Sequence, residues 1–228
     1  SGKSYNVGSC SHSDISTMSF HAVKHITTGE GGVMLTNRSS FEKKAKQLRS
    51  HGVIKDRANM KSKINSSLPW YYEMHELGYN YRLSDINCAL GISQLSRLKE
   101  NIKKRQKLVN FYYKYLKGLT NIELPNKEID CTNNSSWHLF SPLFDIKSIG
   151  ISKASIINKL AENGIGTQVH YIPIYRQPYY RSQYDFNDFP GAEKYYSRTL
   201  SLPLYHSLKQ KDIREISNKI KCILSNEL

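Results

Sequence analysis

The sequence feature that most restricts the fold is a run of helical periodicity from residue 84 to residue 118. Ser84 is a suitable N-cap at its start, and the negative charge of Asp85 favours the positive end of a helix. Apolar side chains then recur along one helix face until Gly118 ends the pattern. We predict that this long helix bridges two domains and bends near residues 91–101.

The region before this helix is predicted to alternate short strands with turns. The segments "TMSF" and "VMLT" indicate strands on either side of the turn "TTGEGG". A helix follows, with Ser39 or Ser40 as its cap and Gly52 as its end. Residues 53–79 are polar and irregular. We assign residues 1–118 to the first domain.

Residues 119–228 have the pattern of a small α+β domain. The segments "SWHLFSPLFDI" and "IGTQVHYIPIY" are predicted strands, and "SKASIINKLAENG" is a predicted helix with Ser152 as its cap and Gly164 as its end. A last helix over residues 209–228 is amphipathic, because isoleucines recur there at helical spacing. The whole chain is therefore predicted to be an α/β protein.

The charge balance raises the question of a nucleic-acid partner. The net charge is +14 and the isoelectric point is about 9.5. The basic residues, however, occur as the runs "KKAK", "KKRQK" and "KQK" on predicted helices, interleaved with apolar positions, which is typical of solvated helix faces. No recognition helix, RNA-binding motif or zinc finger accompanies them. We expect no specific nucleic-acid partner.

The distribution of cysteines and of apolar residues indicates the cellular compartment. Cys10, Cys88, Cys131 and Cys222 are scattered and form no CxxC pair, which favours a reducing cytosol over a disulfide scaffold or a zinc ribbon. No apolar run approaches the ~20 residues that span a bilayer. The first ten residues also lack the apolar core of a signal peptide. We expect a cytoplasmic protein without a membrane partner.

The segment "SFHAVKHITTGEGG" contains the first candidate for chemistry. Lys24 lies between an aromatic-histidine segment and a glycine-rich turn, where a single amine can be held rigidly for covalent catalysis. Ser19 precedes it by five residues and offers a hydroxyl to an anion such as phosphate. The alternative is an ordinary exposed lysine at a turn. His21 and His25 have i, i+4 spacing, but no helix and no third ligand accompany them, so we expect no metal.

Two further segments carry candidate binding residues. In "LGYNYRLSD", Asn80 and Arg82 precede the start of the long helix, where anions bind well; the alternative is a local helix cap. In "QVHYIPIY", His170, Tyr171 and Tyr175 alternate along a predicted strand and suit sugar hydroxyls or phosphates. The alternative for this second segment is a half-buried aromatic strand.

Taken together, these segments resemble one family. "DISTMSFHAVKHITTGEGGVMLTN", "LGYNYRLSDINCALGISQL", "GIGTQVHYIPIY" and "SLPLY" occur in the order seen in the sugar aminotransferases of the DegT/DnrJ/EryC1/StrS family. These are pyridoxal-phosphate enzymes of fold type I, and the resemblance covers nearly the whole chain. It implies that residues 1–118 are the C-terminal portion of the cofactor-binding large domain, with the bridging helix, and that residues 119–228 are the small domain.

The resemblance also implies roles for single residues. Lys24 is the Schiff-base lysine and proton shuttle, and Ser19 binds the cofactor phosphate. Asn80 reaches the phosphate in a neighbouring subunit, which implies a homodimer. His170, Tyr171 and Arg82 lie near the nucleotide-linked substrate. The implied reaction moves an amino group, with glutamate as donor, to C4 of a nucleotide-linked keto-sugar.

The chain departs from the family pattern in one large respect. The family has a long segment before the point where this sequence begins, which carries the phosphate loop, the ring-stacking residue and the acid that pairs with the pyridinium nitrogen. Asp14 lies too close to Lys24 to take the acid's role. We therefore expect a truncated product, one part of a split enzyme whose partner chain supplies the N-terminal half, or a fragment. The alternative function is an inactive remnant that keeps the fold and dimerises.

Overall fold

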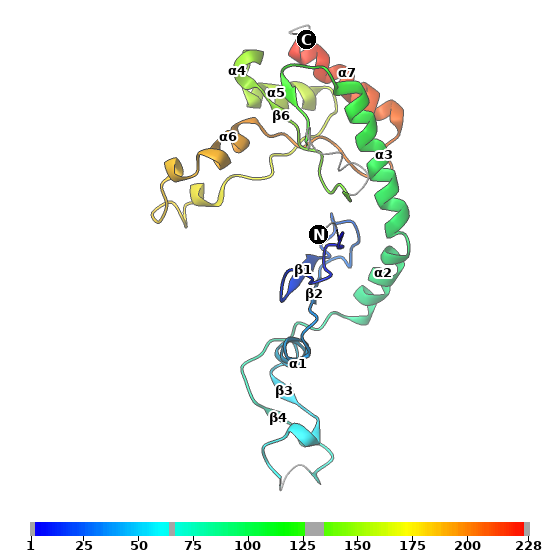
Figure 1. Cartoon of the computed structure of the whole chain (residues 1–228), viewed down its shortest axis with the longest axis vertical. Helices are drawn as coiled ribbons and strands as arrows, with labels where there is room; N and C mark the ends of the chain where they lie inside the picture. Colours follow the sequence, from blue (N-terminus) through cyan, green and yellow to red (C-terminus); the bar gives the residue numbers. More distant parts are fainter. Residues whose placement is uncertain (1–2, 64–66, 126–134, 226–228) are drawn as a thin grey trace. The chain divides into compact units, whose positions relative to one another are not determined.

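The computed structural model describes residues 3–63, 67–125 and 135–225 and divides the chain into two compact units, Ser1–Leu98 and Lys99–Leu228 (Figure 1). The first unit contains β1 (Ser16–Ser19), β2 (Gly32–Leu35), α1 (Ser39–Leu48), β3 (Val53–Ile54), the 3-10 turn η1 (Arg57–Asn59), β4 (Glu73–Met74) and α2 (Asp85–Ser96). The second unit contains α3 (Leu98–Leu116), β5 (Ile122–Glu123), β6 (Leu143–Phe144), α4 (Ile146–Ile149), α5 (Lys153–Glu162), η3 (Ile174–Arg176), η4 (Phe186–Asp188), α6 (Pro190–Arg198) and α7 (Gln210–Leu224).

The first unit is built on two antiparallel strand pairs. β1 pairs with β2, with Ser16 opposite Leu35 and Ser19 opposite Gly32, so the predicted strands "TMSF" and "VMLT" are confirmed with small shifts. β3 pairs with β4 inside the region predicted to be irregular. Gly52 has a φ of +69°, and a Cβ there would lie 1.8 Å from the carbonyl oxygen of Glu76. Glycine is required at this position because a neighbouring backbone segment passes so close.

The predicted serine cap of α1 is wrong. The N-cap residue is Arg38, and its side chain makes no capping hydrogen bond, while Ser39 already lies in the helix. The chain turns earlier than the sequence indicates because the Thr36 hydroxyl accepts a hydrogen bond from the backbone N–H of Arg38 at 3.1 Å. Thr36 in turn donates to the carbonyl oxygen of Asp14 at 2.7 Å. This tertiary contact replaces the local cap.

The predicted long helix is present as two helices. The Ser84 hydroxyl accepts a hydrogen bond from the backbone N–H of Asn87, which confirms the predicted cap of α2. The break falls at Arg97, inside the range where a bend is predicted. The compact units divide at Leu98, so that nearly all of α3 belongs to the second unit, whereas the sequence assigns residues 1–118 to the first domain. The reason is that the apolar face of α3 packs into the second unit's core.

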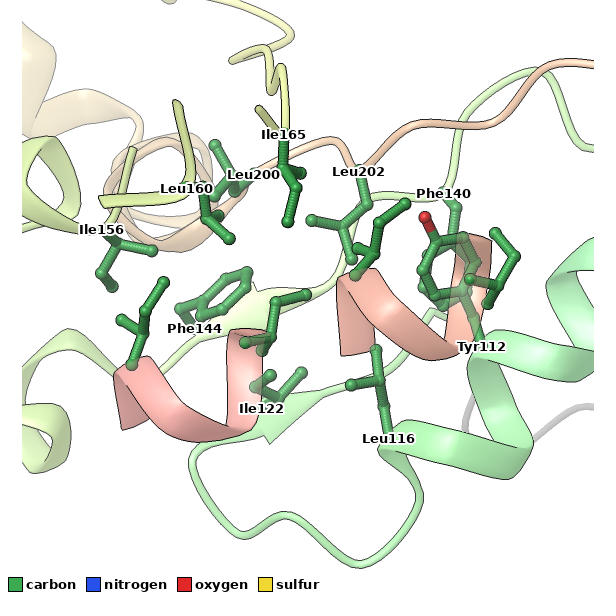
Figure 2. Packing of buried hydrophobic residues seen from close by; sticks show 14 of the residues in the cluster. Tyr112, Leu116, Ile122, Phe140, Phe144, Ile156, Leu160, Ile165, Leu200 and Leu202 are labelled. Carbon is green, nitrogen blue, oxygen red and sulfur yellow. The ribbon is translucent and has the colours of Figure 1, made fainter. Parts of the chain in front are cut away.

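The second unit holds the main hydrophobic core of the described chain. Figure 2 shows Tyr112 and Leu116 of α3 converging with Phe140, Ile156 and Leu202 from later segments. The isoleucines of α7 predicted to share one face are buried, which confirms that helix; they are Ile213, Ile216, Ile220 and Ile223. The Ser152 cap of α5 is also confirmed, since its hydroxyl accepts from the backbone N–H of Ser155 at 3.1 Å. These contacts fix the scaffold on which the later binding segments are mounted.

The two predicted strands of this unit are mostly absent from the structure. Within "SWHLFSPLFDI" only Leu143–Phe144 forms a strand, paired with β5. Within "IGTQVHYIPIY" a single bridge joins Gln168 to Ser201, and the chain then enters η3 after Pro173. Proline has no backbone N–H to continue a ladder, so the alternating pattern there does not become a strand.

Two further sequence expectations concern cysteines and the membrane. Cys10, Cys88 and Cys222 are free, and Cys131 lies outside the described residues. Within residues 3–63, 67–125 and 135–225, no helix has both the length and the apolar character to cross a bilayer.

A half-buried carboxylate joins β4 to the segment that precedes it. Glu73 accepts hydrogen bonds from the backbone N–H groups of Lys61 at 2.6 Å and Ser62 at 2.7 Å, and it lies 2.5 Å from Nε2 of His75. The hydrogen bond with His75, followed by the two backbone bonds, lowers the pKa of Glu73 from 4.5 to about 2. The ionised carboxylate is therefore the form that the folded state favours.

We predict that this part of the first unit loosens in acid. Because the folded pKa of Glu73 is depressed, its contribution to stability is present above pH 4.5 and is lost as the pH falls toward about 2. Amide hydrogen exchange of Lys61 and Ser62 should accelerate across this window after correction for intrinsic rates. In a Glu73→Gln variant the same amides should exchange faster at pH 6, with little further change in acid. Equal protection in both proteins at pH 6 would contradict the prediction.

Candidate functional site

Lys24 lies in the loop that connects β1 to β2. The loop is closed at its base, where the backbone N–H of Phe20 donates to the carbonyl oxygen of Gly31 at 2.8 Å and that of Thr28 donates to the carbonyl oxygen of Phe20 at 3.0 Å. The backbone N–H of Lys24 donates to the carbonyl oxygen of His21 at 3.0 Å, which makes a tight turn. The half-buried Lys24 side chain therefore starts from a constrained backbone.

A buried threonine and an asparagine of α2 anchor this loop. Thr28 is only 3% exposed, and its hydroxyl donates to the carbonyl oxygen of Glu30 at 2.8 Å. The side-chain amide of Asn87 donates to the carbonyl oxygen of Thr28. At Gly31, with a φ of +152°, a Cβ would lie 2.4 Å from the Thr28 hydroxyl. Sequence reasoning missed Thr28 and Asn87, because they are 59 residues apart and nothing in the periodicity connects them.

Ser19 ends β1 on the same hairpin as Lys24. Its hydroxyl oxygen accepts a hydrogen bond from the backbone N–H of His21 at 3.2 Å, so the hydroxyl proton remains available to an anion. Nε2 of His21 lies 3.5 Å from the carboxylate of Glu30, and both side chains are well exposed. The amine of Lys24 and the hydroxyl of Ser19 therefore lie on the same β1–β2 hairpin.

Asn80 and Arg82 lie on the extended segment before α2. Asn80 forms a bridge with Ser50. The backbone N–H groups of the residues on either side of it donate to the carbonyl oxygens of Leu48, the last residue of α1, at 2.8 Å and of the C-cap Arg49 at 2.9 Å. The backbone of this segment is therefore held while the side chains of Asn80 and Arg82 are exposed. The exposed side chains of both residues can therefore contact a ligand or another polypeptide.

His170 and Tyr171 lie in the second unit. Nδ1 of His170 is 2.8 Å from the hydroxyl of Ser201, which is 2.7 Å from the hydroxyl of Ser141. The rings of His170 and Tyr171 are nearly perpendicular, with centroids 4.6 Å apart, and Tyr171 is 73% exposed. Tyr175, which the sequence places on the same predicted strand, lies instead in η3. Ser201 orients His170 although no sequence spacing relates the two.

Solved structures with the same fold are aminotransferases. PseC from Helicobacter pylori, described as an aminotransferase involved in the biosynthesis of pseudoaminic acid, matches with a TM-score of 0.82 and 30% identity over 94% of this chain and 54% of PseC. Spr1654 from Streptococcus pneumoniae, solved in a PLP form, matches with a TM-score of 0.81 and 25% identity over 96% of this chain and 54% of Spr1654. The predicted fold class, part of a fold type I aminotransferase, is confirmed.

The family assignment comes from the sequence. Residues 2–221 match the model of the DegT/DnrJ/EryC1/StrS aminotransferase family, and the chain belongs to this family. The UDP-4-amino-4,6-dideoxy-N-acetyl-beta-L-altrosamine transaminase of Campylobacter jejuni is 36% identical over 222 residues, which are 97% of this chain and 55% of the relative. The chain spans about half the length of the relatives it matches.

The groups on the β1–β2 hairpin fit pyridoxal phosphate. A primary amine such as that of Lys24 can bond to the cofactor's aldehyde, and the free proton of the Ser19 hydroxyl can be donated to its phosphate. The base of the loop fixes both groups on one short segment, because the backbone N–H of Phe20 donates one hydrogen bond and its carbonyl oxygen accepts another. The hairpin therefore offers an amine and a hydroxyl whose chemistry suits the aldehyde and the phosphate of this cofactor.

Proposed function

We propose that this chain takes part in amino transfer from glutamate to C4 of a nucleotide-linked keto-sugar, with pyridoxal phosphate as cofactor. The observation that carries the proposal is Lys24 on a loop closed at Phe20 and anchored by Asn87, in a chain of the DegT/DnrJ/EryC1/StrS family. When bound, the cofactor supplies an electron sink that stabilises negative charge on the substrate carbon. The description of PseC supports pseudaminic acid synthesis as the pathway.

The roles proposed for the first unit follow from its chemistry. Nζ of Lys24 would hold the cofactor through its aldehyde carbon, with water as the leaving group, and the free amine would carry a proton to and from the substrate carbon. The Ser19 hydroxyl donates to the cofactor phosphate. Asn80 and Arg82, exposed on a held backbone, contact a cofactor phosphate in a neighbouring subunit and an anionic substrate group, respectively. This arrangement implies a homodimer.

The roles proposed for the second unit concern the substrate. Ser201 holds the His170 ring so that Nε2 faces away from the Ser141–Ser201 pair and can hydrogen-bond a sugar hydroxyl. The exposed Tyr171 adds a ring and a hydroxyl beside it. We propose a cytoplasmic location, where nucleotide sugar and glutamate are both available, and a separate or continuous polypeptide that supplies the rest of the family fold.

The test is transfer of labelled nitrogen. The chain is incubated with pyridoxal phosphate, ¹⁵N-glutamate and a UDP-linked 4-keto-6-deoxy-N-acetyl sugar, alone and with a polypeptide corresponding to the N-terminal half of a family relative. Mass spectrometry should find the label in an amino sugar and an equal amount of 2-oxoglutarate. If a folded chain with the added half yields neither product, the inactive remnant is the better interpretation.

A further inference from the structure

Three polar side chains of the second unit form a continuous chain of hydrogen bonds. Nδ1 of His170 lies 2.8 Å from the Ser201 hydroxyl, which lies 2.7 Å from the Ser141 hydroxyl. Among the residues that the structure describes, the Ser141 hydroxyl has no other hydrogen-bond partner, so the chain ends there. The order of the protons along these bonds decides whether Nε2, the outer nitrogen of His170, is a donor or an acceptor.

The backbone holds Ser201 at the middle of this chain of hydrogen bonds. The N–H of Ser201 donates to the carbonyl oxygen of Gln168 at 2.8 Å, and the N–H of Gln168 donates back to that of Ser201 at 3.2 Å. Leu200 and Leu202, on either side of Ser201, are buried in the core shown in Figure 2. Because alternate residues of an extended segment point to opposite faces, the Ser201 side chain points away from that core. Ser201 is only 5% exposed, so solvent has little access to its hydroxyl.

The Ser201 hydroxyl has one proton and two possible acceptors, Nδ1 of His170 and the hydroxyl oxygen of Ser141. An imidazole nitrogen is far more basic than a hydroxyl oxygen, so it accepts the stronger hydrogen bond. When Ser201 donates to Nδ1, the Ser141 hydroxyl can donate to the oxygen of Ser201, and both hydroxyl protons are bonded. The opposite order leaves the Ser141 proton with no acceptor in the described part of the chain. Both arguments favour donation from Ser141 to Ser201 and from Ser201 to His170.

We propose that Ser201 is a positioning residue that fixes the Nε2–H tautomer of His170. Since Nδ1 accepts from Ser201, Nε2 carries the only proton of the neutral ring. The ring of Tyr171, nearly perpendicular to that of His170 with centroids 4.6 Å apart, holds the imidazole from a second side. His170 therefore offers a ligand a hydrogen-bond donor, which selects a carbonyl or hydroxyl oxygen, and it does not act as a general base. The identity of that oxygen as one of the keto-sugar rests on the proposed function, whereas the tautomer does not.

The test is nuclear magnetic resonance of the full chain labelled with ¹⁵N-histidine, at about pH 8, where an ordinary imidazole is neutral. Long-range ¹H–¹⁵N spectra distinguish a protonated ring nitrogen from an unprotonated one, and a His170→Gln variant identifies the signals of His170. The unmodified chain should show only the Nε2–H form. Ser201→Ala should allow both tautomers to exchange, so the two ¹⁵N shifts should move toward each other. Ser201→Thr keeps a hydroxyl and should retain the original shifts.

Two further serine variants complete this test. Ser141→Ala should leave the Nε2–H form in place, because Ser201 still donates to Nδ1; with the opposite proton order, it would remove the last acceptor and change the tautomer. Ser197→Ala, at an exposed position of α6, is the matched control and should change nothing. Far-UV circular dichroism checks that each variant is folded. A dominant Nδ1–H form in the unmodified chain would overturn the proposal without any variant, and so would unchanged shifts in folded Ser201→Ala.

Amino transfer gives a readout that separates this proposal from the proposed function. With the polypeptide that supplies the N-terminal half, Ser201→Ala should raise the KM for the keto-sugar about 2–10-fold, as expected for one neutral hydrogen bond. If only the tautomer is wrong, labelled nitrogen still reaches the sugar and Ser201→Ala leaves this KM unchanged. If only the amino-transfer proposal is wrong, the variants show the predicted ¹⁵N shifts while no amino sugar forms.

Discussion

Replacement of Lys24 by alanine should abolish covalent attachment of pyridoxal phosphate. When the chain is combined with a polypeptide corresponding to the N-terminal half of a family relative, mixed with the cofactor and reduced with borohydride, it should carry one phosphopyridoxyl group, and peptide mass mapping should place it on Lys24. Lys43→Ala, on the exposed surface of α1, should leave the label in place. The physical reason is that Lys24 starts from a backbone turn closed at 3.0 Å by His21, whereas the Lys43 side chain extends into solvent.

A second variant separates charge from nucleophilicity at this position. Lys24→Arg keeps the positive charge but removes the amine, so it should also lose the label. Where transfer is measured, both variants should slow it by at least about 10²–10⁴-fold, the range that proton transfer alone contributes. Retention of the label on the same peptide region in Lys24→Ala, or equal labelling of many lysines, would remove the central claim about this hairpin.

The elements that sequence predicts well are those with local causes. Ser84 and Ser152 cap their helices through the backbone N–H three residues later, and the isoleucines of α7 need only a repeating spacing. The failures have distant causes. Arg38 replaces the predicted serine cap because Thr36 is tied to Asp14, and Pro173 interrupts a segment whose alternation resembles a strand.

In the candidate site, too, the sequence predicts features with local causes and misses contacts between distant residues. Residue chemistry alone leaves Lys24 as either a reactive amine or an exposed charge at a turn, and the family resemblance favours the reactive amine. The structure adds the physical reason for rigidity, which is the contact from Asn87 to Thr28 across 59 residues. The link from Ser201 to His170 is of the same kind. Such pairs cannot be read from spacing, because only the fold brings them together.

The second large effect concerns stability, and it should be confined to the second unit. Phe140 is fully buried, and its ring stacks on that of Tyr112 with centroids 4.6 Å apart and planes 8° apart. The Tyr112 hydroxyl donates to the carbonyl oxygen of Pro203 at 2.8 Å, which fixes the ring on which Phe140 packs. Phe140→Ala should therefore lower the free energy of unfolding by about 3–5 kcal/mol, the usual cost of emptying such a site.

The chain offers both a reporter and a control for this measurement. Trp137 is buried 6.2 Å from the Phe140 ring, whereas Trp70 in the first unit is 73% exposed, so a Trp70→Phe background isolates the fluorescence of the core. In urea, Phe140→Ala should move the Trp137 transition to much lower denaturant. Ile92→Ala on α2, where the side chain is 72% exposed, should change it by less than about 0.5 kcal/mol. If the two variants shifted the transition equally, the Trp137 signal would depend no more on Phe140 than on an exposed residue of the first unit. That result would contradict the assignment of the stabilising core to the second unit.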